Sequence, residues 1–312
     1  MKAVLPAIAR GLLEPHLPVG IEPAWFASPD EAKAMIADAE IAWVDMQPTA
    51  LVADAIRAAG PHLRWVSTIY AGLDAFPLDL LRARGVTVTN GAGINAVAVA
   101  EYAVLGVLAA AKRFDIVLRA ADRQDWLTDA PGKVELADTR ALVVGYGTIG
   151  RLIGERLAAF GVAVTGVTRS GRDGTLTPGA WAAHIGDFDW VILAAPSTDA
   201  TRALIGPQEI AAMRRTAWLI NIARGDMIDE AALLAALADG GIAGAFLDPT
   251  DPEPLPPGHP LWTAPNCMIS MHLSGRSQTK MFQRGAALFL DNARAFVAGA
   301  SMRNVADLDA GY

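Results

Sequence analysis

Three polar side chains that could carry chemistry each follow a predicted β-strand in the C-terminal half of the chain. Arg224 comes just after the apolar run AWLINI, Glu253 lies in a proline-rich loop after GIAGAFLD, and His272 follows NCMIS. Because the carboxyl ends of parallel strands meet at one edge of a sheet, we expect these three side chains to point into the same crevice.

Arginine, histidine and carboxylate are the groups that reduction of a 2-oxo acid requires. A guanidinium can bind the substrate carboxylate and polarise the carbonyl group, while a protonated imidazole delivers a proton as hydride arrives. Glu253, hydrogen-bonded to the other ring nitrogen, would stabilise the imidazolium form of His272. In the oxidative direction the neutral imidazole would act as the base.

Structural roles for these residues stay open. Arg224 could cap a helix or pair with Asp226, and a histidine after a strand is often only a satisfied polar residue. No pair of histidines has the spacing of metal ligands, so no metal is expected. The other histidines lie in predicted turns or surface segments: His16, His62, His184 and His259.

A glycine-rich turn, VVGYGTIG (143–150), stands between an apolar strand and an amphipathic helix. Gly145 permits a tight turn, Gly147 lets the backbone approach a pyrophosphate, and Gly150 lets the helix pack closely on the strand. The context on both sides favours a dinucleotide site over a turn with incidental glycines.

The strand after this motif ends in arginines instead of a carboxylate. An NAD site expects an acidic residue about 20 residues past the last glycine, where it binds the ribose 2′-hydroxyl. Here Arg169, Ser170 and Arg172 occupy that region. Two guanidinium groups and a hydroxyl suit a 2′-phosphate, so we predict that NADP(H) is preferred and NAD(H) possible, the alternative being two exposed loop arginines.

The pattern of elements predicts an α/β protein with two doubly wound parallel sheets. Short β-branched or aromatic runs alternate with alanine-rich helical patterns from end to end. We expect a Rossmann-type nucleotide domain (99–276) inserted in a flavodoxin-like substrate domain (1–98 plus 277–312), to which the last helix returns. The two crossings would form a hinge.

Composition excludes several classes of protein. The formal net charge is −7 with no Lys/Arg cluster, which argues against a nucleic-acid partner. Cys267 is the only cysteine, so internal disulfides are excluded and a reducing, cytoplasmic setting is expected. Arg10 and the prolines near the start argue against an export signal. The apolar run 96–111 is too short for a membrane span and contains Glu101, which indicates a buried helix and hints at a subunit interface.

In these motifs the sequence resembles the D-isomer-specific 2-hydroxyacid dehydrogenases over nearly its whole length. The matching segments include AGLD (71–74), GVTVTNGAGINAVAVAEYAV (85–104), INIARGDMIDE, DPEPLPPGHPLW and RNVADLDAGY. The resemblance implies a catalytic arginine, glutamate and histidine at Arg224, Glu253 and His272. It also implies a homodimer formed by the helix after Val99. The RSGR stretch is similar to the NADP(H)-using glyoxylate and hydroxypyruvate reductases.

The resemblance further implies binding positions. Substrate would be bound by Tyr70 and by backbone amides near Ala71, Gly72 and Leu73. Tyr70, Met46 and Trp262 are predicted pocket walls, with ordinary packing as the alternative. The predicted cofactor-binding residues are Gly145, Tyr146, Gly147, Thr148, Ile149, Gly150, Arg169, Ser170, Arg172, Ala195, Pro196, Ile222, Ala223 and Asp248. For Asp248, bonding to its own loop backbone is an alternative.

Two positions depart from the family pattern. Met271 stands where the family usually has proline before the histidine, and Pro249 and Thr250 replace the usual apolar pair after Asp248. The spacing from Asp248 to Glu253 is kept.

We therefore predict an NADPH-linked reductase of a small 2-oxo acid that forms the D-2-hydroxy acid. A formate or phosphite dehydrogenase on the same fold is one alternative, although formate sites in the family carry glutamine beside the histidine. A cofactor-sensing, corepressor-like binding protein is the other, because such a protein could retain the same three residues.

Overall fold

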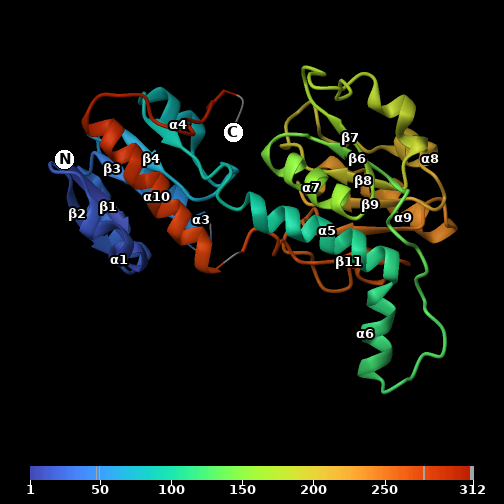
Figure 1. Ribbon diagram of the computed structural model, residues 1–312. Helices are drawn as coiled ribbons and strands as arrows, with labels where there is room; N and C mark the ends of the chain where they lie inside the picture. The colour runs from blue at the N-terminus through green and yellow to red at the C-terminus, as the bar shows by residue number, and fades with distance from the viewer. Residues whose placement is uncertain (47, 49, 277, 310–312) are drawn as a thin grey trace. The chain divides into compact units, whose positions relative to one another are not determined.

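The chain forms two compact units, each built around one parallel sheet. The computed structural model describes residues 1–46, 48, 50–276 and 278–309. The first unit comprises residues 1–95 and 277–312, and the second comprises residues 96–276. Each sheet has helices around it (Figure 1), which confirms the predicted α/β fold class with two parallel sheets.

The first unit contains a five-stranded sheet in the order β2-β1-β3-β4-β5, which is the flavodoxin-like order. All neighbouring strands pair in parallel. The strands are β1 (Lys2–Pro6), β2 (Glu22–Phe26), β3 (Ile41–Ala42), β4 (Trp65–Ser67) and β5 (Thr87–Thr89). The helices are α1 (Arg10–Leu13), α2 (Pro29–Met35), α3 (Ala50–Arg57), α4 (Leu78–Ala83) and α10 (Gln278–Val297).

Local signals and aromatic packing place the helices of the first unit. Helix α2 begins after Ser28, whose side chain accepts a hydrogen bond from the amide of Glu31. The C-terminal helix α10 packs on the sheet through Phe289, whose ring stacks on Trp65 at a centroid distance of 5.0 Å. Burial of this apolar face explains why the end of the chain belongs to the first unit.

The second unit contains a six-stranded sheet in the order β11-β10-β9-β8-β6-β7. The strands are β6 (Arg140–Val144), β7 (Ala163–Val167), β8 (Trp190–Leu193), β9 (Trp218–Asn221), β10 (Gly244–Leu247) and β11 (Cys267–Ile269). The helices are α5 (Ala96–Lys112), α6 (Phe114–Asp122), α7 (Thr148–Ala159), α8 (Pro207–Ala212) and α9 (Glu230–Asp239). One apolar cluster joins α5 and α7 to the sheet, and a separate cluster joins α8 and α9 to it, as in a doubly wound fold.

Helix ends in the second unit follow from single residues. Asp229 caps α9 by accepting from the amide of Ala232, and Gly240 ends the helix with a φ of 71°, which glycine adopts without a Cβ penalty. Gly161, just after the end of α7, also has a left-handed backbone, with a φ of 80°.

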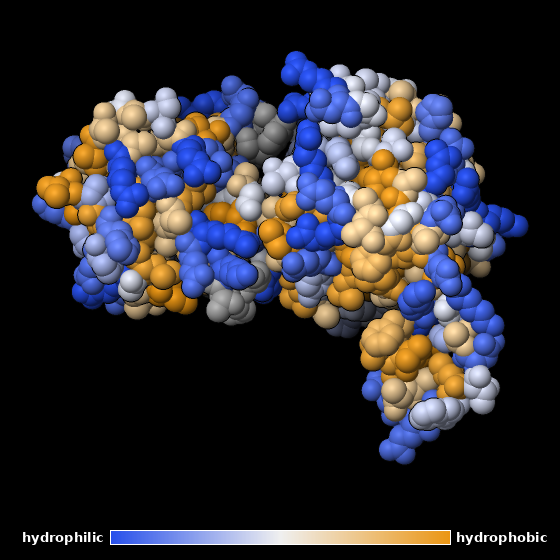
Figure 2. All heavy atoms as spheres, viewed as in Figure 1, coloured by the Kyte–Doolittle hydropathy of each residue, from blue (hydrophilic) through white to orange (hydrophobic). Residues whose placement is uncertain are grey.

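A segment that the sequence analysis did not predict extends from this unit. Figure 1 shows α6 and the chain that follows it standing away from the rest of the second unit, and residues 114–134 are called the arm below. Arg113, with a φ of 47°, makes the turn between α5 and α6. Apolar side chains are exposed on the arm (Figure 2), namely Phe114, Leu118, Trp126, Leu127 and Val134.

Within the described residues, no helix combines the length and the apolar character that a membrane crossing requires.

Candidate active site

The loops that carry Arg224, Glu253 and His272 leave three adjacent strands of the second unit. β10 pairs with β9 on one side and with β11 on the other, all in parallel. The three loops therefore leave the same edge of the sheet, at the carboxyl ends of the strands, where ligands of such sheets bind.

Glu253 and His272 are in direct contact. Oε2 of Glu253 lies 2.8 Å from Nδ1 of His272, and Oε1 accepts a hydrogen bond from the amide of Thr250 at 3.1 Å. This is the contact expected from the sequence. The imidazole is 43% exposed, so it remains accessible from outside the protein.

The charge of Glu253 is set by its neighbours. Partial burial alone would raise the pKa of Glu253, but the hydrogen bond and charge of His272, the Thr250 amide and the positive charge of Arg224 together hold that pKa below its ordinary value. Glu253 is therefore a carboxylate at neutral pH. Because the charge of Arg224 acts on it, this arginine shares the electrostatic environment of the pair.

A buried carboxylate shapes the loop that carries His272. Asp248 is 1% exposed, and its carboxylate accepts from Ser270 Oγ at 2.6 Å and from the amides of Leu273 and Ser274 at 2.9 Å and 3.2 Å. Its carbonyl oxygen accepts from the amide of His272 at 2.7 Å. These contacts support the structural alternative for Asp248, because its side chain is occupied by the protein.

The backbone of Met271 and His272 is left-handed, with φ values of 56° and 54°. Proline cannot adopt this conformation, because its ring holds φ near −65°. The methionine that departs from the family pattern therefore stands in a loop shape that proline would not permit.

The position of Arg224 is set by a tight turn after β9. Asn221 is fully buried; its side chain donates to the carbonyl of Arg224 at 2.7 Å and accepts from the amide of Ala223 at 3.0 Å. A Cβ on Gly225 would overlap the backbone of Thr250, so the turn that carries Arg224 lies directly against the loop that carries Glu253.

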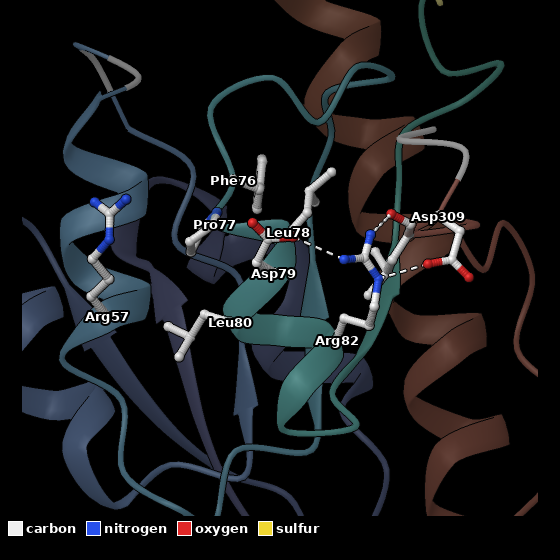
Figure 3. A pocket seen from close by; sticks show the side chains of 9 residues that line it. Arg57, Phe76, Pro77, Leu78, Asp79, Leu80, Arg82 and Asp309 are labelled. Carbon is white, nitrogen blue, oxygen red and sulfur yellow. Dashed lines mark hydrogen bonds and ion pairs between the residues drawn. The ribbon is translucent and has the colours of Figure 1, made fainter.

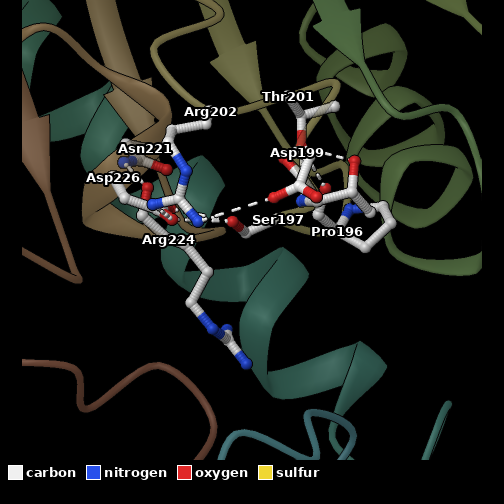
Figure 4. Close-up of polar contacts among 9 residues, drawn as sticks. Pro196, Ser197, Asp199, Thr201, Arg202, Asn221, Arg224 and Asp226 are labelled. Carbon is white, nitrogen blue, oxygen red and sulfur yellow. Dashed lines mark hydrogen bonds and ion pairs between the residues drawn. The ribbon is translucent and has the colours of Figure 1, made fainter. Parts of the chain in front are cut away.

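The contacts around Arg224 do not support its two structural alternatives, a helix cap and an ion pair with Asp226. Its side chain makes no capping bond to the 3-10 turn that follows. The Asp226 carboxylate accepts from Ser197 Oγ at 2.9 Å and from Arg202 at 3.1 Å. Figure 4 shows the Arg224 side chain extending away from this group.

The glycine motif has the shape of a dinucleotide cradle. A Cβ on Gly145, whose φ is 98°, would overlap the backbone of Ala195, and a Cβ on Gly150 would overlap the carbonyl of Gly145. Gly147 has no other atom within 4 Å of its Cβ position, and α7 begins immediately after it. Open space in front of a helix amino terminus fits a pyrophosphate.

The remaining cofactor predictions lie at the same edge of the sheet, where its strands end. Gly145 follows β6, and β6 is flanked by β7 and β8, so the direction of winding changes beside it. Thr148 and Ile149 open α7, while Ala195 and Pro196 follow β8, and Ile222 and Ala223 follow β9. Tyr146 differs, because a Cβ on Gly154 or Gly166 would overlap its side chain, which shows that its ring is used for packing.

The arginine-containing loop after β7 is ordered by threonines. The hydroxyls of Thr168 and Thr175 are 2.7 Å apart, and Thr168 also accepts from the amide of Gly171. On this loop Arg169, Ser170 and Arg172 are exposed. The adjacent acid, Asp173, pairs with Arg151 of α7 at 3.5 Å, so a carboxylate is present just beyond the arginines but is engaged by a helix residue.

The predicted substrate-binding residues lie in the first unit, as a loop after β4 that is called the 70–73 loop below. Within the described part of the chain, no hydrogen bond uses the N–H groups of Ala71, Gly72 or Leu73. Ala71 is exposed, whereas Leu73 is buried in the core. Among the predicted pocket walls, Met46 packs partly against the core of the first unit, and Trp262 in the second unit donates to the carbonyl of Pro256.

Comparison with known proteins decides the family. Residues 104–274 match the model of the D-isomer specific 2-hydroxyacid dehydrogenase NAD binding domain. The chain belongs to the D-isomer specific 2-hydroxyacid dehydrogenase family. The family suggested by the sequence motifs is thereby confirmed, and with it the assignment as an oxidoreductase.

Individual members of this dehydrogenase family match most of the chain. A Mus musculus protein named glyoxylate reductase/hydroxypyruvate reductase is 34% identical over 256 residues, which cover 78% of this chain and 77% of that protein. The glycerate dehydrogenase of Methylorubrum extorquens is 32% identical over 305 residues, or 95% of this chain and 94% of that protein. A D-isomer specific 2-hydroxyacid dehydrogenase family protein from Aeromonas salmonicida subsp. salmonicida has a crystal structure that matches with a TM-score of 0.88 and 26% identity, covering 99% of each chain.

The dehydrogenase also contains a polar residue beside the 70–73 loop that the sequence analysis missed. Asp45 follows β3 and accepts hydrogen bonds of 2.7 Å from Trp43 Nε1, Thr68 Oγ1 and the amide of Ile69. Burial raises the pKa of Asp45 to about 6, although the three donors act in the opposite direction. The sequence signal that could have pointed to Asp45 is its position, an acidic residue directly after a short apolar strand.

Among the described residues, no three histidine, cysteine, aspartate or glutamate side chains are grouped so as to hold a metal ion.

Proposed function

We propose that this dehydrogenase reduces a small 2-oxo acid to the D-2-hydroxy acid with NADPH, in the manner of a glyoxylate or hydroxypyruvate reductase, and catalyses the reverse oxidation. The observation that carries the proposal is the 2.8 Å contact between His272 and Glu253, formed by the loops after β11 and β10, next to the loop after β9 that carries Arg224. A histidine oriented by an ionised carboxylate is suited to transfer a proton at neutral pH.

Each residue of the site has a separate task in this proposal. When bound, the dinucleotide supplies the hydride. Arg224 binds the substrate and polarises its carbonyl, which stabilises the negative charge that develops on oxygen. His272 uses Nδ1 to bind Glu253, so its Nε2 is the nitrogen that gives a proton during reduction and takes it back during oxidation.

The 70–73 loop is assigned to the substrate carboxylate in this proposal. Its amides at Ala71, Gly72 and Leu73 are donors without partners in the described part of the chain, and a carboxylate is the natural acceptor for a row of such donors. In this proposal the loop binds the carboxylate end of the substrate, while Arg224 and His272 act at the carbonyl carbon.

The cofactor preference is proposed from the loop after β7. Arg169 and Arg172 are exposed on either side of Ser170, at the position where an NAD site would present an acid. Asp173 is engaged by Arg151, which leaves the neighbouring arginines to bind a 2′-phosphate. NADP(H) is therefore the proposed preference, with NAD(H) as a weaker cofactor.

We also propose that the protein is a homodimer in which the arm and α5 form the interface. Trp126 is 90% exposed and Leu118 is 53% exposed on a segment that projects from its own unit. Exposed aromatic and aliphatic side chains gathered in one place are typical of an interface. Sedimentation should show the Leu118→Glu variant as a monomer and Val19→Glu, at a 97% exposed position in the first unit, as a dimer.

The main test is a panel of 2-oxo acids mixed with the protein and NADPH. Glyoxylate, hydroxypyruvate or phenylpyruvate should cause loss of nicotinamide absorbance, and the Arg224→Ala variant should lose this activity while Arg215→Ala keeps it. Arg215 lies before β9, at the opposite edge of the sheet, and is the matched control. If the wild-type protein binds NADPH but reduces no acid of the panel, a cofactor-sensing role would replace the proposal.

A further inference from the structure

The 70–73 loop is supported on one side by the chain segment that follows β5. The amide of Gly91 donates to the carbonyl of Tyr70 at 2.7 Å, and the Asn90 side chain donates to the carbonyl of Ala71 at 3.1 Å. A Cβ on Gly91 would overlap the backbone of Ile69, so the two segments are in direct backbone contact.

These two hydrogen bonds determine where the loop amides point. A trans peptide group directs its C=O and its N–H to opposite sides. Gly91 binds the carbonyl of Tyr70 and Asn90 binds the carbonyl of Ala71. The N–H groups of the same two peptides, those of Ala71 and Gly72, therefore face away from the segment that follows β5. They are two of the three donors proposed for the substrate carboxylate.

Asn90 is in turn held by Asn304, near the end of the chain. The amide of Asn90 donates to the carbonyl of Asn304 at 3.0 Å, and the Asn304 side chain donates to the carbonyls of Asn90 and Ala92 at 3.2 Å and 2.8 Å. The Asn90 side-chain oxygen accepts from the amide of Ala92, which leaves its nitrogen for Ala71. Both polar atoms of the Asn90 side chain are therefore engaged in this network.

The segment that carries Asn304, residues 302–309, is bound along β5. Val305 forms an antiparallel bridge with Thr89, and the amide of Ala306 donates to the carbonyl of Val88 at 2.8 Å. Further along, Arg82 of α4 binds the carbonyl of Leu308 and the carboxylate of Asp309 (Figure 3).

We propose that the 302–309 segment positions the carboxylate-binding loop, with Asn304 and Asn90 as the positioning residues through which it acts. This inference rests on the proposed function only for the identity of the ligand, a substrate carboxylate. Asn304 touches no proposed catalytic residue, and its effect reaches the substrate through Asn90 and the peptide group between Ala71 and Gly72.

The test separates the side-chain role of Asn304 from its backbone role. Asn304 has a φ of 54°, a conformation that glycine adopts at no cost. The Asn304→Gly variant should therefore keep the backbone shape but lose both donors. We expect its KM for the 2-oxo acid to rise about tenfold, the effect of one or two hydrogen bonds, while kcat and the KM for NADPH stay close to wild type. Asn90→Ala should behave in the same way.

A matched control leaves the network intact. Arg82→Ala removes the contacts to Leu308 and Asp309 but not those of Asn304, so its KM for the 2-oxo acid should be unchanged. Thermal unfolding of each variant verifies that it is folded.

Hydrogen–deuterium exchange supplies a readout that does not depend on activity. The amide of Gly91 donates to the carbonyl of Tyr70 and that of Ala92 to the Asn90 side chain, and both should exchange faster in Asn304→Gly than in the wild type. Unchanged exchange would overturn the positioning role. Faster exchange with an unchanged KM would overturn its link to substrate binding. Absence of turnover in the wild-type protein would instead overturn the proposed function, and the exchange data would still decide whether Asn304 orders the loop.

Discussion

Nδ1 of His272 lies 2.8 Å from Oε2 of Glu253, across 19 positions of the chain. The carboxylate is held on its other side by the amide of Thr250, and its pKa is lowered below the ordinary value against the effect of partial burial. Nδ1 of the imidazole is thus bound to a fixed negative charge, which orients the ring and leaves Nε2 for the substrate.

The Glu253→Gln variant should test that charge. Glutamine keeps the size of the side chain but removes the negative charge that binds Nδ1 of His272, so the imidazole is held less firmly for proton transfer. We expect kcat for reduction to fall at least about tenfold, as expected when general acid catalysis is impaired, while the KM for NADPH stays close to wild type. Steady-state reduction at neutral pH checks this loss. Glu230→Gln is the control, because Glu230 contacts a histidine outside the site, His259, at 3.4 Å; a loss of equal size there would contradict the assignment.

The Met271→Pro variant should lose most of its activity. Proline cannot reach the φ of 56° observed at this position, so the loop would have to move and carry His272 away from Glu253. We expect kcat to fall at least about tenfold, in line with the loss of general acid catalysis. Met271→Gly accepts the same backbone and should retain kcat within about twofold. Full activity in the proline variant would show that the left-handed loop is dispensable.

Replacement of Arg169 and Arg172 by alanine should weaken the binding of NADPH far more than the binding of NADH. A charge-assisted hydrogen bond contributes about 1.5–3 kcal/mol, which corresponds to a ten- to hundredfold rise in the KM for NADPH. The KM for NADH should change little, since NADH lacks the 2′-phosphate. An equal rise in the KM for both cofactors would contradict the proposed NADP(H) preference.

Asp45 should make the stability of the protein depend on pH. Its pKa is raised from 3.8 to about 6, so the folded state holds the proton more tightly than the unfolded state does. The stabilisation of the protonated form is fully present below about pH 4 and is lost as pH rises through about 6, a change of roughly 3 kcal/mol.

Thermal unfolding of the wild type and Asp45→Asn at several pH values measures this effect. Asparagine does not titrate, so the melting temperature of the wild type should decline relative to that of the variant between pH 4 and pH 7. A constant difference over this range would mean that Asp45 does not change its protonation as proposed.

Much of the fold followed from local patterns. Alternation of short apolar runs with helical segments predicts both sheets, and Ser28, Gly161 and Gly240 stand at helix ends in the structure, where their residue types are favoured. The arm was not predicted. Its helix α6 is amphipathic, but among its described residues only Ala120 is buried, so its apolar side chains cover no core of their own unit.

The candidate site was predictable to the level of residue type. Polar residues after successive parallel strands must lie at one edge of a sheet, which is why Glu253 and His272 could be paired in advance. The roles of Asp45 and Asn304 could not be predicted, because their partners lie 23 and 214 positions away along the chain. The residues next to a polar side chain in a turn do not indicate which distant group it will bind.

The sequence by itself determined the alternation of strands and helices, the glycine cradle and the three residue types that follow strands β9, β10 and β11. These features depend on short-range sterics and hydrophobic periodicity, which are set by neighbouring residues. Only the tertiary structure decided the left-handed backbone at Met271 and His272 and the contacts that join Asn304, Asn90 and Ala71. Those features depend on hydrogen bonds between segments that meet only when the sheets and helices have packed.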